Sequence, residues 1–367
     1  MERDQQSHYS DMAQQFAQLK TEFKADMAHF TSSQSVDLIE KLFAAHKKAT
    51  IDLPQESIIA SLLYPGMANR RAMIMTPEHS TYDWIFDTTS AVPRPVRYIP
   101  WVEKDVGIFW VTGKAGSGKS TLMKYMCNDE RTRAALAQWA GSRKLLTASH
   151  YFWSLGSPME QNYSGLLRSI LYDIFRSCPA LIEPICKLRW AEALQGKDVR
   201  SMPWEDLQLQ DCIKTLVTSN LEVEGQTPCF CFFIDGLDEF FGDKRLADAL
   251  VSLADTGRTK ICASSRPWNT FEDAFVASKQ RGSYLELHHH TRPDIAKVVE
   301  GELGAKLIKI NRTGAKWNSL VQDVIDRAEG VFLWVTLVLR NELIPCLESR
   351  EDIQFLKERL DAVPSGK

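Results

Sequence analysis

A glycine-rich segment, Gly113-Lys114-Ala115-Gly116-Ser117-Gly118-Lys119-Ser120 followed by Thr121, contains the clearest chemistry in the sequence. Its spacing fits GxxxxGK[ST], the Walker A pattern, at every fixed position. The glycines let the backbone curl so that several N–H groups point at one phosphate. A helix that begins near Lys119 adds the positive end of its dipole. We therefore expect this segment to hold the phosphates of ATP or GTP, with Lys119 at the β and γ phosphates and Ser120 on Mg²⁺.

Acidic residues follow an apolar run farther along the chain. Residues 229–234, CFCFFI, lead into Asp235-Gly236-Leu237-Asp238-Glu239. A buried strand that ends in aspartate beside a phosphate loop is the Walker B arrangement. We expect Asp235 to hold Mg²⁺, directly or through a water, and Asp238 or Glu239 to orient or deprotonate the attacking water. Solvated turns also have this composition, so the interpretation depends on the phosphate loop that precedes it.

A second run, residues 260–264, is followed by Ser265 and Arg266. An arginine at the tip of a neighbouring strand can reach the γ phosphate and so distinguish ATP from ADP. A surface arginine that caps a loop is the alternative. The sequence therefore adds Arg266 to the candidate catalytic residues Lys119, Asp238 and Glu239.

Two weaker features involve histidines. His288-His289-His290 invites a metal interpretation, but successive residues of a strand point to opposite faces, so we do not expect all three to bind one ion. Residues 78–81, EHST, precede the phosphate loop and either touch the nucleotide base or cap a helix.

Strands and helices alternate from residue 106 onward. The apolar runs predict strands over residues 106–112, 145–153, 229–234, 260–264 and 284–287. Amphipathic patterns predict helices over residues 120–126, 163–175, 205–219 and 246–254, and helical structure throughout residues 293–360. Fully apolar strands separated by helices predict a parallel sheet that is covered on both faces. The predicted fold class is α/β, a P-loop NTPase sheet with a helical segment before it and a helical subdomain after it.

The chain divides into four expected parts. They are a helical N-terminal segment (1–60), a lead-in strap rich in proline (61–100), the P-loop NTPase core (101–290) and a helical subdomain (291–367). Apolar residues in the first part recur three or four apart, at Phe16, Leu19, Phe23, Met27 and Phe30. This stripe predicts a helical hairpin that packs on itself or on the next domain, or else a surface for self-association or for a protein partner.

Composition excludes several classes of protein. The 367 residues have a net charge of −3, with 44% hydrophobic and 25% charged residues, which is an ordinary globular balance. The sequence has no excess of basic residues, so its charge gives no indication of a nucleic-acid partner. The N-terminal sequence MERDQQSHYS lacks the apolar region of a secretory signal, and no apolar run is long enough to span a bilayer. The eight cysteines include no CxxC pair, which suits reduced thiols in a cytoplasmic protein.

Four segments together resemble the NACHT NTPases of filamentous fungi, which are STAND-class proteins related to NOD-like receptors. These segments are GIFWVTGKAGSGKSTLMKYM, CFFIDGLDEF, KICASSRPW and GVFLWVTLVLRNEL, and the resemblance extends over about residues 60–363. It implies a five-stranded ATPase core, a helical subdomain, and slow ATP hydrolysis that drives a signalling switch in innate immunity or self-recognition. It also assigns phosphate binding to residues 113–121, Mg²⁺ to Ser120 and Asp235, water activation to Asp238 and nucleotide sensing to Arg266.

The resemblance has one departure. In full-length members a winged-helix domain and a repeat array follow the segment that here ends at Lys367. We therefore expect a fragment, a truncated product or a short adaptor-like form, and autoinhibition by the usual route is in doubt.

Two other functions compete with the switch. A scaffold that binds nucleotide without hydrolysing it is one alternative, and a P-loop small-molecule kinase is another, although we find no arginine-rich lid segment. The residues alone leave open ATP versus GTP, the activating ligand, the downstream effector and the oligomeric state; the resemblance favours ATP.

Overall fold

The computed structural model describes residues 51–366 except 52, 79–80, 88–95 and 243–244. The apolar stripe predicted between Phe16 and Phe30 therefore lies outside the described residues, as do His79 and Ser80 of the segment before the phosphate loop. Of that segment, the Thr81 hydroxyl donates a hydrogen bond to the Glu78 carbonyl oxygen at 2.7 Å. A contact between this segment and a nucleotide base stays a prediction.

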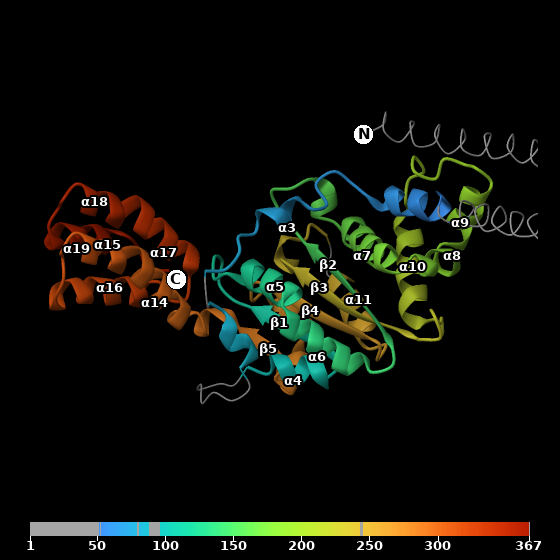
Figure 1. Ribbon diagram of the computed structural model, residues 1–367, viewed down its shortest axis with the longest axis horizontal. Coiled ribbons are helices and arrows are strands. Elements are labelled where there is room, and N and C mark those ends of the chain that lie inside the picture. The colour runs from blue at the N-terminus through green and yellow to red at the C-terminus, as the bar shows by residue number, and fades with distance from the viewer. Residues whose placement is uncertain (1–50, 52, 79–80, 88–95, 243–244, 367) are drawn as a thin grey trace, which may run out of the picture.

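A five-stranded parallel sheet forms the centre of the larger part of the molecule (Figure 1). Its strands are β1 (Gly107–Thr112), β2 (Lys144–Tyr151), β3 (Pro228–Asp235), β4 (Thr259–Ser265) and β5 (Tyr284–Glu286). Their order is β2-β3-β4-β1-β5, and every pair is parallel. The predicted fold class is thus confirmed. Because β4 lies between β1 and β3, the acidic strand is not a direct neighbour of the strand that leads into the phosphate loop.

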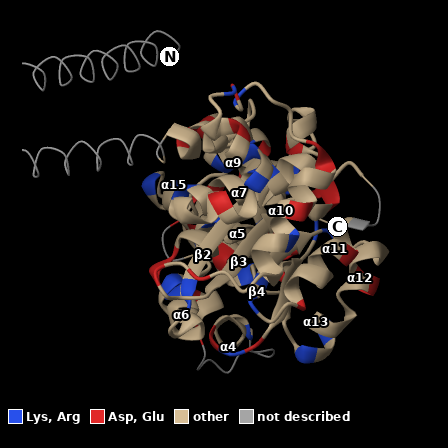
Figure 2. Ribbon diagram, turned by 90° about the vertical axis from the view of Figure 1, so that its right-hand side faces the viewer, with Lys and Arg blue, Asp and Glu red and all other residues tan. Residues whose placement is uncertain are grey.

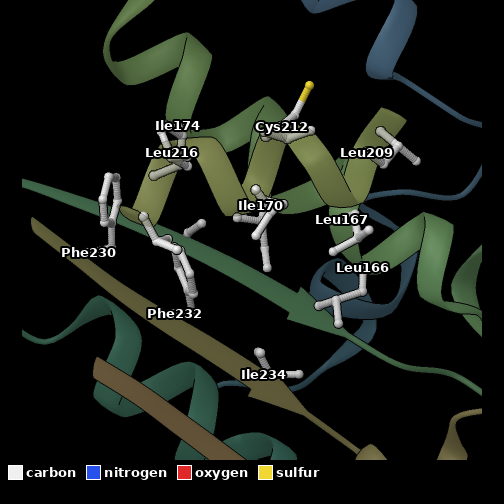
Figure 3. Packing of buried hydrophobic residues seen from close by; sticks show 14 of the residues in the cluster. Leu166, Leu167, Ile170, Ile174, Leu209, Cys212, Leu216, Phe230, Phe232 and Ile234 are labelled. Atoms are coloured by element: carbon white, nitrogen blue, oxygen red, sulfur yellow. The ribbon is translucent and has the colours of Figure 1, made fainter. Parts of the chain in front are cut away.

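The two faces of the sheet are covered by different helices. Helices α4 (Tyr98–Glu103), α5 (Lys119–Asn128) and α6 (Glu130–Ala140) bury one face, which includes Cys231 and Phe233 of β3. Helices α7 (Tyr163–Ser177), α10 (Asp206–Thr218) and α11 (Arg245–Ala254) lie over the other face. There Phe230, Phe232 and Ile234 pack beneath α7 and α10 (Figure 3). Successive residues of β3 therefore alternate between two cores, which explains why the whole strand is apolar.

Shorter helices complete this part of the molecule. They are α3 (Asn69–Met73), the 3-10 helix η1 (Asp83–Phe86), α8 (Ile182–Ile185), α9 (Lys187–Leu194), α12 (Asn269–Ala274) and α13 (Val276–Arg281). Further 3-10 turns are η2 (Pro158–Glu160), η3 (Pro179–Leu181), η4 (Leu237–Glu239) and η5 (Leu287–His289). Lys and Arg residues are interspersed with Asp and Glu residues along the helices, among them α6, α9 and α10 (Figure 2). In the described part of the chain, no helix has the length and hydrophobicity that crossing a bilayer requires.

The C-terminal residues form a helical unit beside the sheet (Figure 1). Its elements are α14 (Arg292–Val299), the π-helical turn η6 (Glu300–Gly304), α15 (Ala305–Lys309), α16 (Ala315–Arg327), α17 (Phe332–Val338), a second π-helical turn η7 (Leu339–Leu343), α18 (Ile344–Glu348) and α19 (Ile353–Ala362). This unit has an apolar core of its own, which runs from Ile295 to Leu360. The helical pattern predicted for residues 293–360 is confirmed.

The expectation that His288, His289 and His290 lie on a strand was wrong. Strand β5 ends at Glu286, and the next three residues form the 3-10 turn η5, closed by a hydrogen bond from the His290 amide to the Leu287 carbonyl at 2.9 Å. The alternation of side chains along a strand therefore does not apply to these histidines. Within the described ranges, no group of three or more His, Cys, Asp or Glu residues is arranged to hold a metal ion.

Candidate functional site

The glycine-rich loop connects the end of β1 to the start of α5. Gly116 and Gly118 have φ values of 70° and 93°, a region that L side chains rarely occupy, so the loop requires glycine at both positions. The Lys119 ammonium turns back over the loop and donates hydrogen bonds to the carbonyl oxygens of Gly113 (2.8 Å) and Lys114 (2.9 Å). The glycine turns and the lysine thus lie together at the start of α5, where the helix dipole favours an anion.

Lys119 is electrostatically coupled to the acidic strand end. Burial lowers the pKa of its ammonium, while the negative charges of Asp238 and Asp235 raise it. The loop lysine and the two aspartates therefore lie close enough to interact electrostatically, although they come from distant parts of the sequence.

Asp235 is the last residue of β3 and its side chain is buried. Its Oδ1 accepts a hydrogen bond of 2.5 Å from the Ser264 hydroxyl on β4. Its Oδ2 is buried and has no hydrogen-bond partner among the described residues. Burial raises the pKa of the Asp235 carboxyl, and the hydroxyl groups of Ser264 and Ser120 oppose that shift. A buried carboxylate oxygen with unused capacity near the Ser120 hydroxyl provides the oxygen ligands that Mg²⁺ prefers.

Asp238 and Arg266 form a direct ion pair. The Arg266 backbone amide donates to Asp238 Oδ1 at 2.9 Å, and the Arg266 Nε lies 2.9 Å from Asp238 Oδ2. The Asp238 side chain is 6% exposed, whereas that of Arg266 is 49% exposed. Both carboxylate oxygens of Asp238 are thus occupied in this conformation. Each oxygen keeps a second lone pair, but the positive charge of Arg266 makes the Asp238 carboxylate a weaker base than an unpaired one.

Glu239 points toward the end of β2. Its Oε2 accepts hydrogen bonds from the backbone amide (2.8 Å) and the hydroxyl (3.0 Å) of Ser154. The two acids that the sequence left as alternatives therefore have different partners, Arg266 for Asp238 and Ser154 for Glu239. Of the two acids, Asp238 is the one that is paired with Arg266.

Three further polar atoms lie near the loop; Ser117 belongs to the segment predicted to bind phosphate, whereas Thr112 and His288 were not among the predicted site residues. Thr112 Oγ1, Ser117 Oγ and His288 Nδ1 are buried and have no hydrogen-bond partner in the described part of the chain. A Cβ atom added at Gly113 would lie 3.1 Å from Ser117 Oγ and 3.4 Å from His288 Nδ1, so the first glycine of the loop lies close to both. Ser264 was also missed, although a small polar residue that ends an apolar run beside Arg266 was a usable signal.

The C-terminal helical unit contacts the phosphate loop directly. The Leu333 amide donates to the Gly116 carbonyl oxygen at 3.1 Å. The Lys114 ammonium lies 3.1 Å from the Glu329 carboxylate and also donates to the carbonyl oxygens of Glu329 (3.2 Å) and Gly366 (3.3 Å). A cavity of about 400 Å³ opens at this junction, with Lys114, His288 and Glu329 in its wall. The helical unit therefore covers one side of the loop.

Residues 81–87 cover another side of the loop. The Tyr82 hydroxyl lies 3.4 Å from the Gly118 carbonyl oxygen. Asp294 Oδ2, from helix α14, accepts hydrogen bonds from the Tyr82 amide (3.0 Å) and the Trp84 indole (2.7 Å). Asp294 is fully buried, and its other oxygen lies 3.3 Å from the Lys297 ammonium. This carboxylate joins the lead-in strap to the C-terminal helical unit.

Comparison with known proteins gives a family and a distant structural likeness. The chain is similar to a solved structure described as the Aeropyrum pernix ORC2 protein in ADPNP–ADP complexes, one of four matching chains. That likeness has 15% sequence identity and a TM-score of 0.37, and it covers 76% of this chain and 71% of the other. No curated protein sequence matches the chain.

The family match includes the candidate site. The model of the family described as nephrocystin 3, N-terminal, matches residues 80–266, which is just over half of the chain. This range begins before the phosphate loop and ends at Arg266. The chain therefore belongs to the nephrocystin 3 N-terminal family.

Proposed function

We propose that the chain binds ATP with Mg²⁺ at the phosphate loop, hydrolyses it slowly, and acts as a signalling switch of the NACHT kind. The observation that carries this proposal is the meeting of Lys119, Ser120, Asp235, Asp238 and Arg266 at one end of the sheet. These five residues come from three separate segments of the sequence, and the parallel fold brings them together.

Phosphate binding would use groups that already face the loop. The Lys119 ammonium would exchange the carbonyl oxygens of Gly113 and Lys114 for phosphate oxygens, which form stronger charge-assisted hydrogen bonds. The amide groups of the loop and the start of α5 would add positive potential.

Ser120 and Asp235 would hold the Mg²⁺ ion. The support is the Oδ2 atom of Asp235, which is buried without a hydrogen-bond partner among the described residues, near the Ser120 hydroxyl. When bound, Mg²⁺ would neutralise the charge that develops on the β and γ phosphates.

The Asp238–Arg266 pair accounts for slow hydrolysis. A γ phosphate would compete with Asp238 for the Arg266 guanidinium, because phosphate and carboxylate both accept from arginine. Transfer of the guanidinium to the phosphate frees the Asp238 carboxylate, which can then orient and deprotonate the attacking water. In each turnover the Arg266 guanidinium would have to leave Asp238 for the γ phosphate, and this step would lower the rate of hydrolysis.

A binding scaffold without turnover is the second candidate function. It is favoured by the same ion pair, because an aspartate that stays paired with Arg266 is a weaker base. Self-association through residues 1–60, and a cytoplasmic location, stay predictions.

Single-turnover assays with radiolabelled ATP and excess protein test the proposal. Release of ADP and phosphate, abolished by Lys119→Ala, is the expected result. ATP that is bound but unchanged would support the scaffold, and a labelled small molecule would support a kinase. Failure to bind any nucleotide would overturn all three.

A further inference from the structure

Two cysteine thiols lie against each other in the helices outside the sheet. Cys186 Sγ is 3.7 Å from Cys212 Sγ, and the two residues are 26 positions apart in the chain. Cys186 lies at the junction of α8 and α9, and Cys212 lies on α10. Cys186 is 4% and Cys212 7% exposed, and both belong to the large apolar cluster on this side of the sheet.

A buried arginine gives this pair a positive surrounding. Arg189 follows Cys186 on α9, and its guanidinium donates to the carbonyl oxygens of Val199 (2.9 Å) and Pro203 (2.8 Å). The hydrogen bond from Cys186 lowers the pKa of the Cys212 thiol; burial and the negative charge of Asp211 oppose this shift, and the charge of Arg189 supports it. Of the two sulfurs, Cys212 is therefore the better nucleophile.

We propose that Cys186 and Cys212 are a redox-reactive pair that forms a disulfide with hydrogen peroxide as the oxidant. The Cys212 thiolate attacks one peroxide oxygen, the O–O bond breaks, and the departing hydroxide takes a proton to become water. The resulting sulfenic acid is attacked by the Cys186 sulfur, the S–O bond breaks, and a second water leaves with the Cys186 proton. In sum, two thiols lose two electrons and two protons, and one peroxide becomes two waters.

Little movement is needed to make this bond. A disulfide requires the sulfurs to approach by about 1.7 Å from their present separation. Cys212 points away from β3, on the outer side of α10 (Figure 3). Side-chain rotation and a small shift of the α8–α9 junction can therefore close the bond without moving the sheet.

The bond would tie the α8–α9 junction to α10. It would close a loop between residues 186 and 212 and so reduce the freedom of the unfolded chain. We expect oxidation to raise the melting temperature by roughly 5 °C, and reduction by dithiothreitol to reverse the change.

Peptide mapping tests the proposal on the full chain. The reduced protein is treated with graded hydrogen peroxide, free thiols are alkylated, and the unreduced protein is digested with trypsin. Cleavage after lysine and arginine places Cys186 in residues 177–187, together with Cys178, and Cys212 in residues 201–214. We expect these two peptides to be cross-linked, with fragmentation assigning the bond to Cys186.

Cys178 provides the matched control, because it is buried in the same cluster and shares a peptide with Cys186. Cys178→Ser should keep the cross-link, whereas Cys186→Ser and Cys212→Ser should each abolish it. Fragment ions of the wild-type cross-link decide between Cys178 and Cys186 even if a variant fails to fold. A bond to Cys178, or oxidation of Cys212 to sulfinic acid without any cross-link, would overturn the proposal.

Discussion

Two buried charges on neighbouring strands lie at opposite ends of the sheet, and their surroundings differ. Asp235 ends β3 at the edge that holds the phosphate loop, and one of its oxygens has no hydrogen-bond partner among the described residues. Lys260 is the second residue of β4, near the other edge, where its buried side chain donates from the ammonium to the carbonyl oxygens of Trp101 (2.6 Å) and Asp105. It also lies 5.0 Å from the ring centre of Trp101 and 4.8 Å from that of Trp139.

This difference distinguishes a buried charge that stabilises the fold from one that is available to bind a ligand. Lys260 supports the end of α4 with several partners, so its role is structural. Asp235 retains capacity for a ligand, and because an unsatisfied buried acceptor costs folding free energy, it points to a site that a ligand completes. The comparison predicts that changes at the loop edge alter nucleotide binding and leave folding intact, whereas changes at Lys260 do the reverse.

The largest effect is expected from Lys119→Ala. Loss of charge-assisted hydrogen bonds to phosphate should weaken nucleotide binding by roughly 100- to 1,000-fold, measured by isothermal titration calorimetry. Lys260→Met is the control at the other edge and should keep the affinity within about twofold. Equal losses in both variants would remove the contrast between the two edges.

Asp238→Asn should come next. An amide cannot accept the proton of the attacking water, so the single-turnover rate should fall roughly 100-fold while nucleotide affinity changes little. Glu239→Gln is the matched control, because Ser154 holds that side chain away from Arg266. If Glu239→Gln slows hydrolysis and Asp238→Asn does not, Glu239 is the base.

Asp235→Asn should weaken ATP binding in the presence of Mg²⁺ by roughly tenfold and have little effect in excess chelator. The same substitution should leave the melting temperature unchanged or raise it, because it replaces a buried carboxylate that has an unused acceptor. A large loss of thermal stability without nucleotide would instead make Asp235 a structural residue like Lys260.

The smallest effect concerns pH. Burial lowers the pKa of Lys260 to about 8, so the folded protein releases this proton at a lower pH than the unfolded chain does. The unfolded state then binds more protons between about pH 8 and 10, and this group should raise the free energy of unfolding by about 1 kcal/mol per pH unit. The test is the difference between wild type and Lys260→Met in urea unfolding at pH 8 and pH 9. A difference that does not change with pH would contradict the assignment.

The sequence was most informative where one segment determines its own structure. The buried strands were predicted within about two residues because apolar runs such as 229–234 have no other stable place than a covered sheet. The phosphate loop was recognisable because its glycines, lysine and serine are contiguous. The described helices after residue 291 followed from a regular helical pattern in the same way.

Contacts between distant segments could not be predicted from local pattern. Asp238 and Arg266 were given separate roles, and their pairing depends on β3 and β4 being neighbours in a particular register. The histidine turn was assigned to a strand because nothing in the sequence shows where β5 stops pairing with β1. The thiol pair has no motif, since it depends on how α8 and α10 pack.

The carboxylate of Asp294 has a mechanical consequence for the phosphate loop. It holds the Tyr82 amide and the Trp84 indole from within helix α14, so separating α14 from the strap would leave a buried anion and two donors without partners. That cost favours movement of Tyr82 and Trp84 together with the helical unit. When Leu333 leaves Gly116, Tyr82 would then leave Gly118 in the same motion. Both sides of the loop would be exposed together, in a single kinetic step.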